Sequence, residues 1–274
     1  MKKPITIICP TWNNEQFLNP CVTSIIKTGI LDSMADLIIV NNGKQDIERV
    51  FGNVPGIKIL NPGTNLGWEG GLELGLKESD SPFVVFQNDD TFLTPGGVHF
   101  YQRLLTLFQN DNVAAVGPVT TCAAGVQSIY HPNCPRVPLE VSYLIFFTVM
   151  VRRKHLEAVG GIDSTLPGGD DFDLSIRLRK AGYNLVVTPG AFLIHHGFKT
   201  GTRVKGDNNV SGGWNSIEMS DRTNKFLIQK HGFRTWWETI SGLKYNMETT
   251  KSDDLEGNLV RSFVNGDQRV AELG

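Results

Sequence analysis

The sequence predicts an α/β fold in which a mostly parallel central sheet is covered by helices on both faces. Short apolar runs bounded by turn residues alternate along the chain with longer amphipathic segments, and no internal repeat is visible. This alternation is typical of βαβ units, in which a helix connects two parallel strands. With 274 residues, the chain is long enough for one large α/β domain and a C-terminal extension.

The expected strands are short runs rich in Val, Ile and Phe. They lie at residues 5–9, 36–40, 57–60, 83–87, 113–117 and 185–188. Runs that are apolar throughout fit strands whose two faces are both buried. The apolar segment 143–147 is also expected to be a buried strand, with contact to a membrane surface as the alternative.

The expected helices have apolar residues at a spacing of three and four. In segment 15–27 this spacing is clear, and Gly29 lies just past its end, where a left-handed cap is expected. Similar patterns predict helices at 66–78, 98–108 and 170–181, and another around 219–231. An aromatic cluster follows at Phe233, Trp236 and Trp237.

Composition and charge indicate an ordinary globular protein. The formal net charge is −2, so we expect no general attraction to nucleic acid or to anionic membranes. The longest apolar stretches are too short for a signal peptide or a transmembrane helix. The cysteines form no CxxC pair, which favours reduced thiols in a cytoplasmic protein. A zinc site from Cys122, His131 and Cys134 is disfavoured because it lacks a fourth ligand.

A strand that ends in carboxylates is the most informative local feature. Segment 83–87 runs directly into Asn88, Asp89 and Asp90. In open α/β sheets, ligands bind beyond the carboxyl ends of the strands, and carboxylate oxygens suit Mg²⁺ or Mn²⁺. The alternative is a polar turn, in which Asp and Asn are common.

A glycine-rich segment, residues 61–71, precedes the helix expected at 66–78. Gly67, Gly70 and Gly71 allow close backbone approach, and the amides at the start of a helix can face an anion. The segment matches neither GxGxxG nor a P-loop, which disfavours a dinucleotide or ordinary ATP site. A tight turn that packs a helix on the sheet is the alternative.

Acidic residues also begin the helix expected at 170–181. Asp170 and Asp173 are well placed for capping and for the helix dipole, and Arg177 lies at the spacing of an ion pair with Asp173. After the alternating segment 189–194 come His195 and His196; two His side chains at a strand end, followed by Gly197, favour a metal ligand among them.

These motifs, in this order, resemble those of the family 2 glycosyltransferases with a GT-A, Rossmann-like fold. The similar segments are 5–13, 38–43, the N-x-G-x-x-G-G loop at 65–71, a D-x-D-like motif at 88–90, an E-D-x-D-L-x-x-R-like motif at 170–177, and 189–197. The loop is similar to that of the rhamnosyltransferase-like branch. Asn41 and Asn88 stand where the family has Asp.

The resemblance implies a role for each matching residue. Asp171 is expected to be the catalytic base, and Mn²⁺ or Mg²⁺ is expected to bind Asp90 with His195 or His196. The expected donor-binding residues are Pro10, Thr11, Asn41, Asn65, Gly67, Asn88, Asp89 and Asp170. Lys199 and Arg203, in a segment expected to form a lid, are candidates for neutralising the departing diphosphate.

The implied activity is that of an inverting, metal-dependent glycosyltransferase of the hexosyltransferase type. The donor is expected to be a UDP-, dTDP- or GDP-sugar, and the acceptor a glycan or another molecule with a hydroxyl group. Residues 1–204 are expected to form the donor-binding and catalytic domain, and 205–274 a partly helical extension on the lid and acceptor side. A sugar nucleotidyltransferase and a catalytically silent binding protein are the alternatives; the departures at Asn41 and Asn88 motivate the second.

Overall fold

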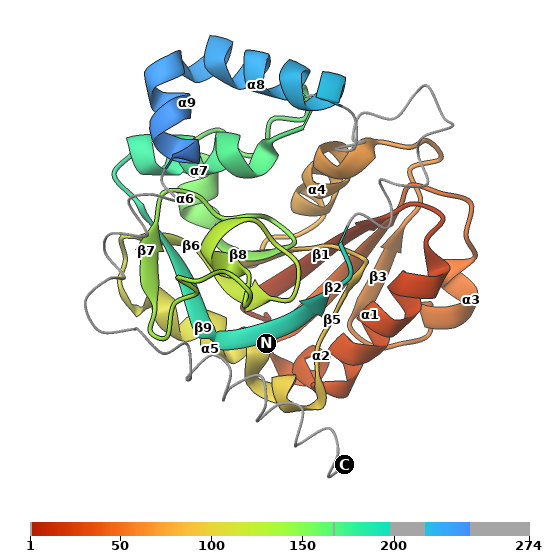
Figure 1. Cartoon of the computed structure of the whole chain (residues 1–274). Helices are drawn as coiled ribbons and strands as arrows, with labels where there is room; N and C mark the ends of the chain where they lie inside the picture. The colour runs from red at the N-terminus through yellow and green to blue at the C-terminus, as the bar shows by residue number, and fades with distance from the viewer. Residues whose placement is uncertain (1, 167, 198–216, 242–274) are drawn as a thin grey trace.

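The computed structural model describes residues 2–166, 168–197 and 217–241, which form a sheet with helices on both faces (Figure 1). The strands are β1 (Ile5–Thr11), β2 (Ala35–Asn41), β3 (Ile57–Leu60), β4 (Phe83–Gln87), β5 (Thr91–Phe92), β6 (Val113–Thr120), β7 (Leu139–Val141), β8 (Thr148–Arg152) and β9 (Asn184–His195). The helices are α1 (Glu15–Lys27), α2 (Ile30–Ser33), α3 (Ile47–Phe51), α4 (Gly67–Lys77), α5 (Phe100–Thr106), α6 (Arg153–Ala158), α7 (Asp170–Lys180), α8 (Ile217–His231) and α9 (Phe233–Ile240).

The strand order brings the carboxyl ends of several strands together on one side of the sheet. The order is β3-β2-β1-β4-β8-β6-β9-β5, and β7 pairs with β9. From β3 to β4 the strands are parallel, so their carboxyl ends lie side by side. The antiparallel strand β8 follows, and β9 is parallel to β6. The end of β9 turns back to pair with β5, which places His195 opposite Thr91 and close to the residues that follow β4.

Alternating side chains divide the core between the two faces of the sheet. Ile7 of β1 and Val85 of β4 pack on the face covered by α1, α2, α3 and α5. Their neighbours Ile8 and Val84 pack on the other face, against α4, α6 and α7. Because both faces are covered, the strands are apolar throughout, which is why the sequence reveals them as continuous apolar runs.

The structure confirms the predicted α/β fold and corrects some of its segments. The bounds of β3, β4 and α1 agree with the prediction, whereas β6 and β9 are longer than expected. The expectation that segment 143–147 forms a strand is wrong: its residues are largely buried, but they lie in the turn between β7 and β8. Burial alone produces an apolar run, so such a run does not distinguish a strand from a packed turn.

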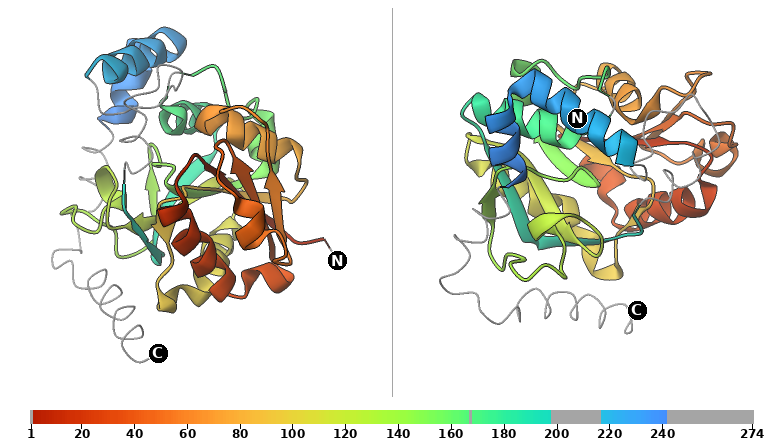
Figure 2. Two further views of the ribbon diagram at one scale, coloured as in Figure 1. Left: turned by 90° about the vertical axis from the view of Figure 1, so that its right-hand side faces the viewer. Right: turned by 45° about the horizontal axis from the view of Figure 1, so that its top comes forward.

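Helices α8 and α9 lie over α7 at one end of the molecule, as Figures 1 and 2 show from different sides. The Trp236 indole donates a hydrogen bond to Asn224, which joins α9 to α8, and the Ser142 hydroxyl donates to the Thr239 carbonyl. Both helices belong to the expected extension 205–274, of which residues 205–216 and 242–274 lie outside the described residues. No helix in the described ranges has the length and apolar character needed to cross a bilayer.

Candidate active site

Asp90 and His195 lie close together beyond the carboxyl end of β4, although they are far apart in the sequence. The Asp90 carboxylate is 3.2 Å from Nε2 of His195, and both side chains are nearly buried. The other ring nitrogen, Nδ1, lies 2.6 Å from the Cys122 carbonyl, which fixes the orientation of the ring. Asn88 approaches the same Nε2, at 3.5 Å. The ring therefore presents Nε2 to the residues that follow β4.

This pair fits a divalent cation. A carboxylate oxygen and an imidazole nitrogen whose partner nitrogen faces a carbonyl are a donor set that suits Mn²⁺, and the carbonyl contact is the usual support of a metal-binding His. Within the described ranges, no group of three His, Cys, Asp or Glu side chains is arranged to hold a metal. Asp90 and His195 would therefore supply only part of the coordination shell of such a cation.

His196, the other candidate ligand, is oriented differently. Its ring packs against Phe17 and Phe92, and its backbone N–H donates to the Asp90 carbonyl. Cys122, His131 and Cys134 are described and do not form a metal-binding group. Lys199 and Arg203 lie outside the described residues.

Asp89 is held by a chain of hydrogen bonds at the end of β1. The Thr11 hydroxyl donates to the Asp89 carboxylate over 2.6 Å, and Gln45 donates to the same hydroxyl over 3.0 Å. The side-chain oxygen Oε1 of Gln45 in turn accepts from the backbone N–H of Asn14. This chain fixes one carboxylate of the Asp89–Asp90 pair at the carboxyl ends of β1 and β4.

The glycine-rich segment packs α4 closely on the sheet. A Cβ atom on Gly71 would lie 2.9 Å from the side chain of Pro10, so only glycine permits this approach. Gly67 has a φ of 73°, and its N–H donates a hydrogen bond to the side-chain oxygen of Asn65 over 2.9 Å. Asn42 bridges β2 to this turn, since its amide donates to the Gly67 carbonyl.

Asn41 closes the loop that follows β2. Its amide nitrogen donates to the Gln45 carbonyl and to the Asn61 side chain, each over 2.9 Å. Its oxygen accepts from the Gly43 N–H over 3.3 Å. An Asn side chain can make both kinds of contact because it carries a donor and an acceptor, whereas an ionised Asp would lack the donor.

The start of α7 faces the start of α4 and brings buried carboxyl groups together. The Trp68 indole donates to Asp170 over 2.9 Å. Burial raises the pKa of Asp170 to about 6, against the hydrogen bond from Trp68. Burial and the charge of Asp170 raise the pKa of Glu69 to about 8. Burial and the charge of Asp170 also raise the pKa of Asp171 well above its ordinary value. Once deprotonated, such a carboxylate is a strong proton acceptor.

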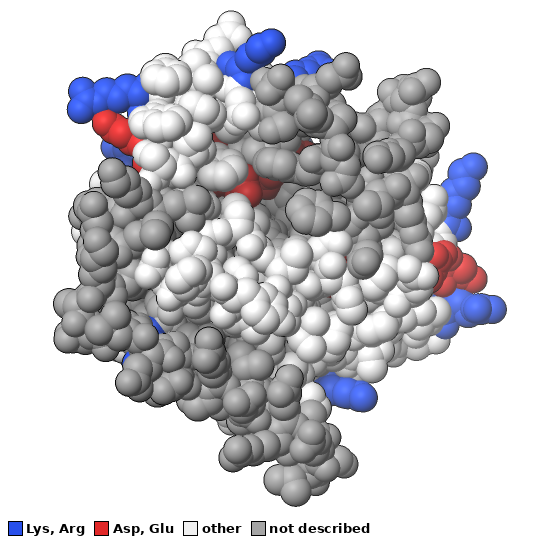
Figure 3. All heavy atoms as spheres, viewed as in Figure 1, with Lys and Arg blue, Asp and Glu red and all other residues white. Residues whose placement is uncertain are grey.

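Figure 3 shows acidic side chains near the middle of the view, with Lys and Arg mostly at the edges.

Sequence reasoning did not identify several residues of this site, namely Asn42, Gln45, Trp68 as a hydrogen-bond donor, and Glu69. Each is a polar group in or beside a recognised motif, and each acts through a contact with another part of the chain. Their position next to Asn41 and Gly67 was the available signal. Their partners, however, are fixed only by the packing of α4, α7 and the loop after β2.

Comparison with known proteins identifies the group to which the chain is similar. The sequence model described as Glycosyl transferase family 2 matches residues 6–163. An uncharacterized Mycobacterium tuberculosis protein, Rv1525, is 28% identical over 209 residues, which cover 72% of this chain and 75% of that protein. The pre-mycofactocin glycosyltransferase of M. tuberculosis is 25% identical over 210 residues, which cover 70% of this chain but 43% of that protein.

Solved glycosyltransferase structures share the fold. The mannosyltransferase PcManGT of Pyrobaculum calidifontis, in complex with GDP-Man and Mn²⁺, has a TM-score of 0.59 at 14% identity. The match covers 100% of this chain and 87% of the PcManGT chain. GalNAc-T7, with UDP, GalNAc and Mn²⁺, has a TM-score of 0.58 at 13% identity. The match covers 70% of this chain and 44% of the GalNAc-T7 chain. At these identities, the likeness confirms the GT-A fold expected from the sequence.

Proposed function

The chain belongs to glycosyl transferase family 2 and is a glycosyltransferase; on that premise we propose that it moves a sugar from a nucleotide-diphosphate donor to an acceptor hydroxyl, with inversion at the anomeric carbon. The observation that carries the proposal is the meeting of Asp90 and His195, 3.2 Å apart, where the strands end. This is the edge at which ligands of open α/β sheets bind. The Asn65–Gly71 loop supports a place in the rhamnosyltransferase-like branch.

The donor is a UDP-, GDP- or dTDP-sugar bound across the ends of β1, β2 and β4. We assign donor binding to residues at these ends and at the starts of the neighbouring helices: Pro10, Thr11, Asn41, Asn88 and Asp89 at the strand ends, Asn65 and Gly67 at the start of α4, and Asp170 at the start of α7. Asp90 and His195 would hold Mn²⁺ or Mg²⁺. When bound, such a cation supplies positive charge that stabilises the leaving diphosphate. Similar solved structures contain Mn²⁺ with GDP-Man or with UDP.

Asp171 is the base of the transfer. Its carboxylate takes the proton from the acceptor O–H while the oxygen forms a bond to the anomeric carbon on the side opposite the donor phosphate. The bond between that carbon and the phosphate oxygen breaks, and the nucleoside diphosphate leaves with the electron pair. The raised pKa of Asp171 makes its deprotonated form a strong base. The acceptor is a glycan or another hydroxyl compound.

Release of nucleoside diphosphate from a panel of UDP-, GDP- and dTDP-sugars tests this proposal. We expect release from one donor with Mn²⁺, and none with excess chelator. Asp171→Asn should reduce turnover by about 10²–10⁴-fold while donor binding persists, because only the base is removed. Asp80→Asn is the matched control, since Asp80 is exposed and pairs with Lys2. Pyrophosphate release from nucleoside triphosphates, or nucleotide binding without turnover of any donor and acceptor, would overturn the proposal.

A further inference from the structure

Helix α8 packs directly on the residue that precedes α7. Gly169, the N-cap of α7, has a φ of 79°. A Cβ atom there would lie 2.8 Å from Cγ2 of Thr223 and 3.1 Å from Cδ1 of Leu227. Thr223 and Leu227 are buried residues of α8. The two helices therefore approach so closely at this point that only glycine fits between them.

The first turn of α7 has no capping side chain before it; within the turn, the Phe172 N–H donates to the Asp171 carboxylate over 2.8 Å. The first N–H groups of any helix lack partners within it, and a capping side chain normally compensates. Gly169 has no side chain to cap α7. This turn carries Asp170 and Asp171, so whatever fixes the turn also fixes these carboxylates.

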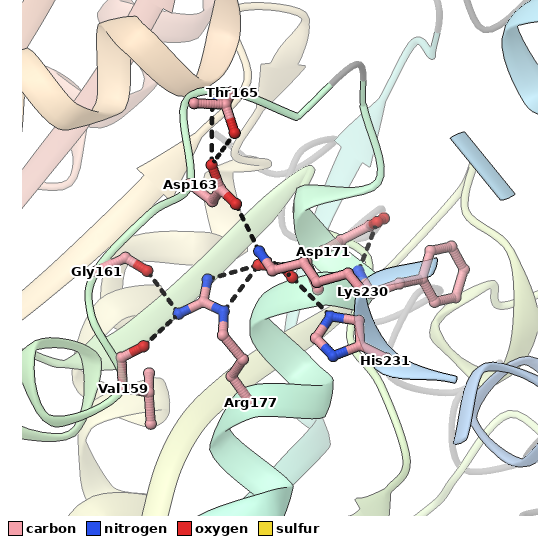
Figure 4. A network of polar contacts seen from close by, with 10 residues as sticks. Val159, Gly161, Asp163, Thr165, Asp171, Arg177, Lys230 and His231 are labelled. Atoms are coloured by element: carbon pink, nitrogen blue, oxygen red, sulfur yellow. Dashed lines mark hydrogen bonds and ion pairs between the residues drawn. The ribbon is translucent and has the colours of Figure 1, made fainter. Parts of the chain in front are cut away.

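The C-terminal end of α8 holds this turn through Asp173. The Asp173 side chain is fully buried and contacts Lys230 at 2.8 Å and His231 at 2.7 Å. Arg177 contacts its other carboxylate oxygen at 2.7 Å. Figure 4 shows Lys230, His231 and Arg177 converging from two helices, with Asp171 close by.

The same contacts extend to the segment before α7. Lys230 also pairs with Asp163 at 2.5 Å. Arg177 donates to the carbonyls of Val159 and Gly161, each over 2.8 Å. Thus α8, α7 and the segment that leads into α7 are joined around the buried Asp173, with the partly exposed Lys230–Asp163 pair at the outside of the cluster.

The charges of this cluster are matched. Burial alone would raise the pKa of Asp173, but the hydrogen bond from Lys230 and the charge of Arg177 outweigh it, so this pKa lies below its ordinary value. The carboxylate is therefore ionised at neutral pH and needs its cationic partners. Removing one partner from a buried charge is costly, because the charge that remains is not solvated.

We propose that Lys230 and His231 are positioning residues for sugar transfer: through Asp173 they fix the first turn of α7 and thereby direct the Asp171 carboxylate at the acceptor hydroxyl. The inference rests on the proposed role of Asp171 as base. It makes the α8 end of the C-terminal extension part of the catalytic unit. A displacement of about 1 Å in a reacting group can reduce turnover by about 10²-fold.

The test compares Lys230→Gln, His231→Asn and the conservative Lys230→Arg in the full chain. The readout is Mn²⁺-dependent release of nucleoside diphosphate from the UDP-, GDP- or dTDP-sugar that wild-type protein turns over. We expect Lys230→Gln and His231→Asn to reduce kcat by about 10–10²-fold with the donor KM within about threefold of wild type. Lys230→Arg should recover most of the loss. Lys225→Gln, at an exposed position of the same helix, should match wild type.

A second measurement does not depend on turnover. Amide hydrogen exchange at residues 169–173 should be faster in His231→Asn than in wild type, because the turn loses one of its outside contacts. Unchanged exchange there would overturn the inference. This measurement also covers the case in which Lys230→Gln does not fold.

The outcomes separate this inference from the proposed function. If Asp171→Asn turns over like wild type, Asp171 is not the base, and both statements fall. If Asp171→Asn loses turnover but Lys230→Gln and His231→Asn keep it, only the positioning inference falls. It also falls if donor KM rises along with the loss of kcat. In the Asp171→Asn background, Lys230→Gln should cause no further loss, since its effect passes through Asp171.

Discussion

Replacing Glu69 with Gln should remove a large part of the pH dependence of the protein's stability. Glu69 lies in the first turn of α4 and is 7% exposed. Burial and the negative charge of Asp170 raise its pKa from 4.5 to about 8. The folded protein therefore holds this carboxyl in its protonated form at neutral pH, whereas the unfolded chain does not.

The sign and size of the effect follow from the two pKa values. Because the folded pKa is the higher one, the stability contributed by Glu69 is present below about pH 4.5 and is lost as the pH rises through about 8. Between pH 5 and pH 9, titration of this one group lowers the free energy of unfolding by about 4 kcal/mol. Gln does not titrate, so Glu69→Gln should be free of this loss. The charge of Glu69 is also one cause of the raised pKa of Asp171, so its removal acts on Asp171 in the same direction.

Urea unfolding at pH 5, 7 and 9, without nucleotide or divalent metal, measures this difference. The stability of Glu69→Gln relative to wild type should increase steadily with pH. Glu73→Gln is the matched control on the same helix. The hydrogen bond with Lys77 lowers the pKa of Glu73 from its ordinary 4.5, so its stabilising effect is lost only at lower pH, and the difference between this control and wild type should stay nearly constant from pH 5 to pH 9.

A constant difference between Glu69→Gln and wild type from pH 5 to pH 9 would refute this reasoning. It would mean that Glu69 titrates near its ordinary pKa and that water or a cation reaches the carboxyl groups between α4 and α7. The raised pKa of Asp171, which has the same physical cause, would then be in question as well.

Three further changes test other parts of the site. Turnover should still rise with pH well above 3.8, the ordinary pKa of an Asp side chain, because burial and the charge of Asp170 raise the pKa of Asp171. A pH–rate profile that levels off near the ordinary pKa would contradict the assignment. Asp90→Ala should weaken Mn²⁺-dependent binding of UDP, GDP or dTDP by at least about tenfold in calorimetry; equal affinity would remove its role as a ligand. Gly169→Ala should destabilise the protein by roughly 2 kcal/mol in thermal unfolding, since its Cβ would lie 2.8 Å from Thr223 at a φ of 79°; an unchanged Tm would show that α8 can move away.

Local sequence patterns were sufficient for the elements that are regular and buried. The three-and-four spacing of apolar residues predicted α1 with its observed bounds, and the apolar run before Asn88 predicted β4. For β9, the sequence pattern predicted a strand at 185–188 and, separately, an alternating segment that begins at Pro189 and Gly190. The strand instead continues through a register shift against β6, between Pro118 and Val119, and so carries His195 to β5.

The sequence by itself determined the alternation of strands and helices and the motifs that mark a glycosyltransferase, because period and residue type are properties of short segments. Only the tertiary structure decided which of these residues meet. Three contacts join positions that are distant in sequence: Asp90 with His195, the hydrogen bond from Trp68 to Asp170, and the contacts of Lys230 and His231 with Asp173. The raised pKa values of Glu69, Asp170 and Asp171 likewise depend on burial and on charges brought close by the packing of α4 against α7. Such distances and such burial are set by the whole fold, so no local segment contains them.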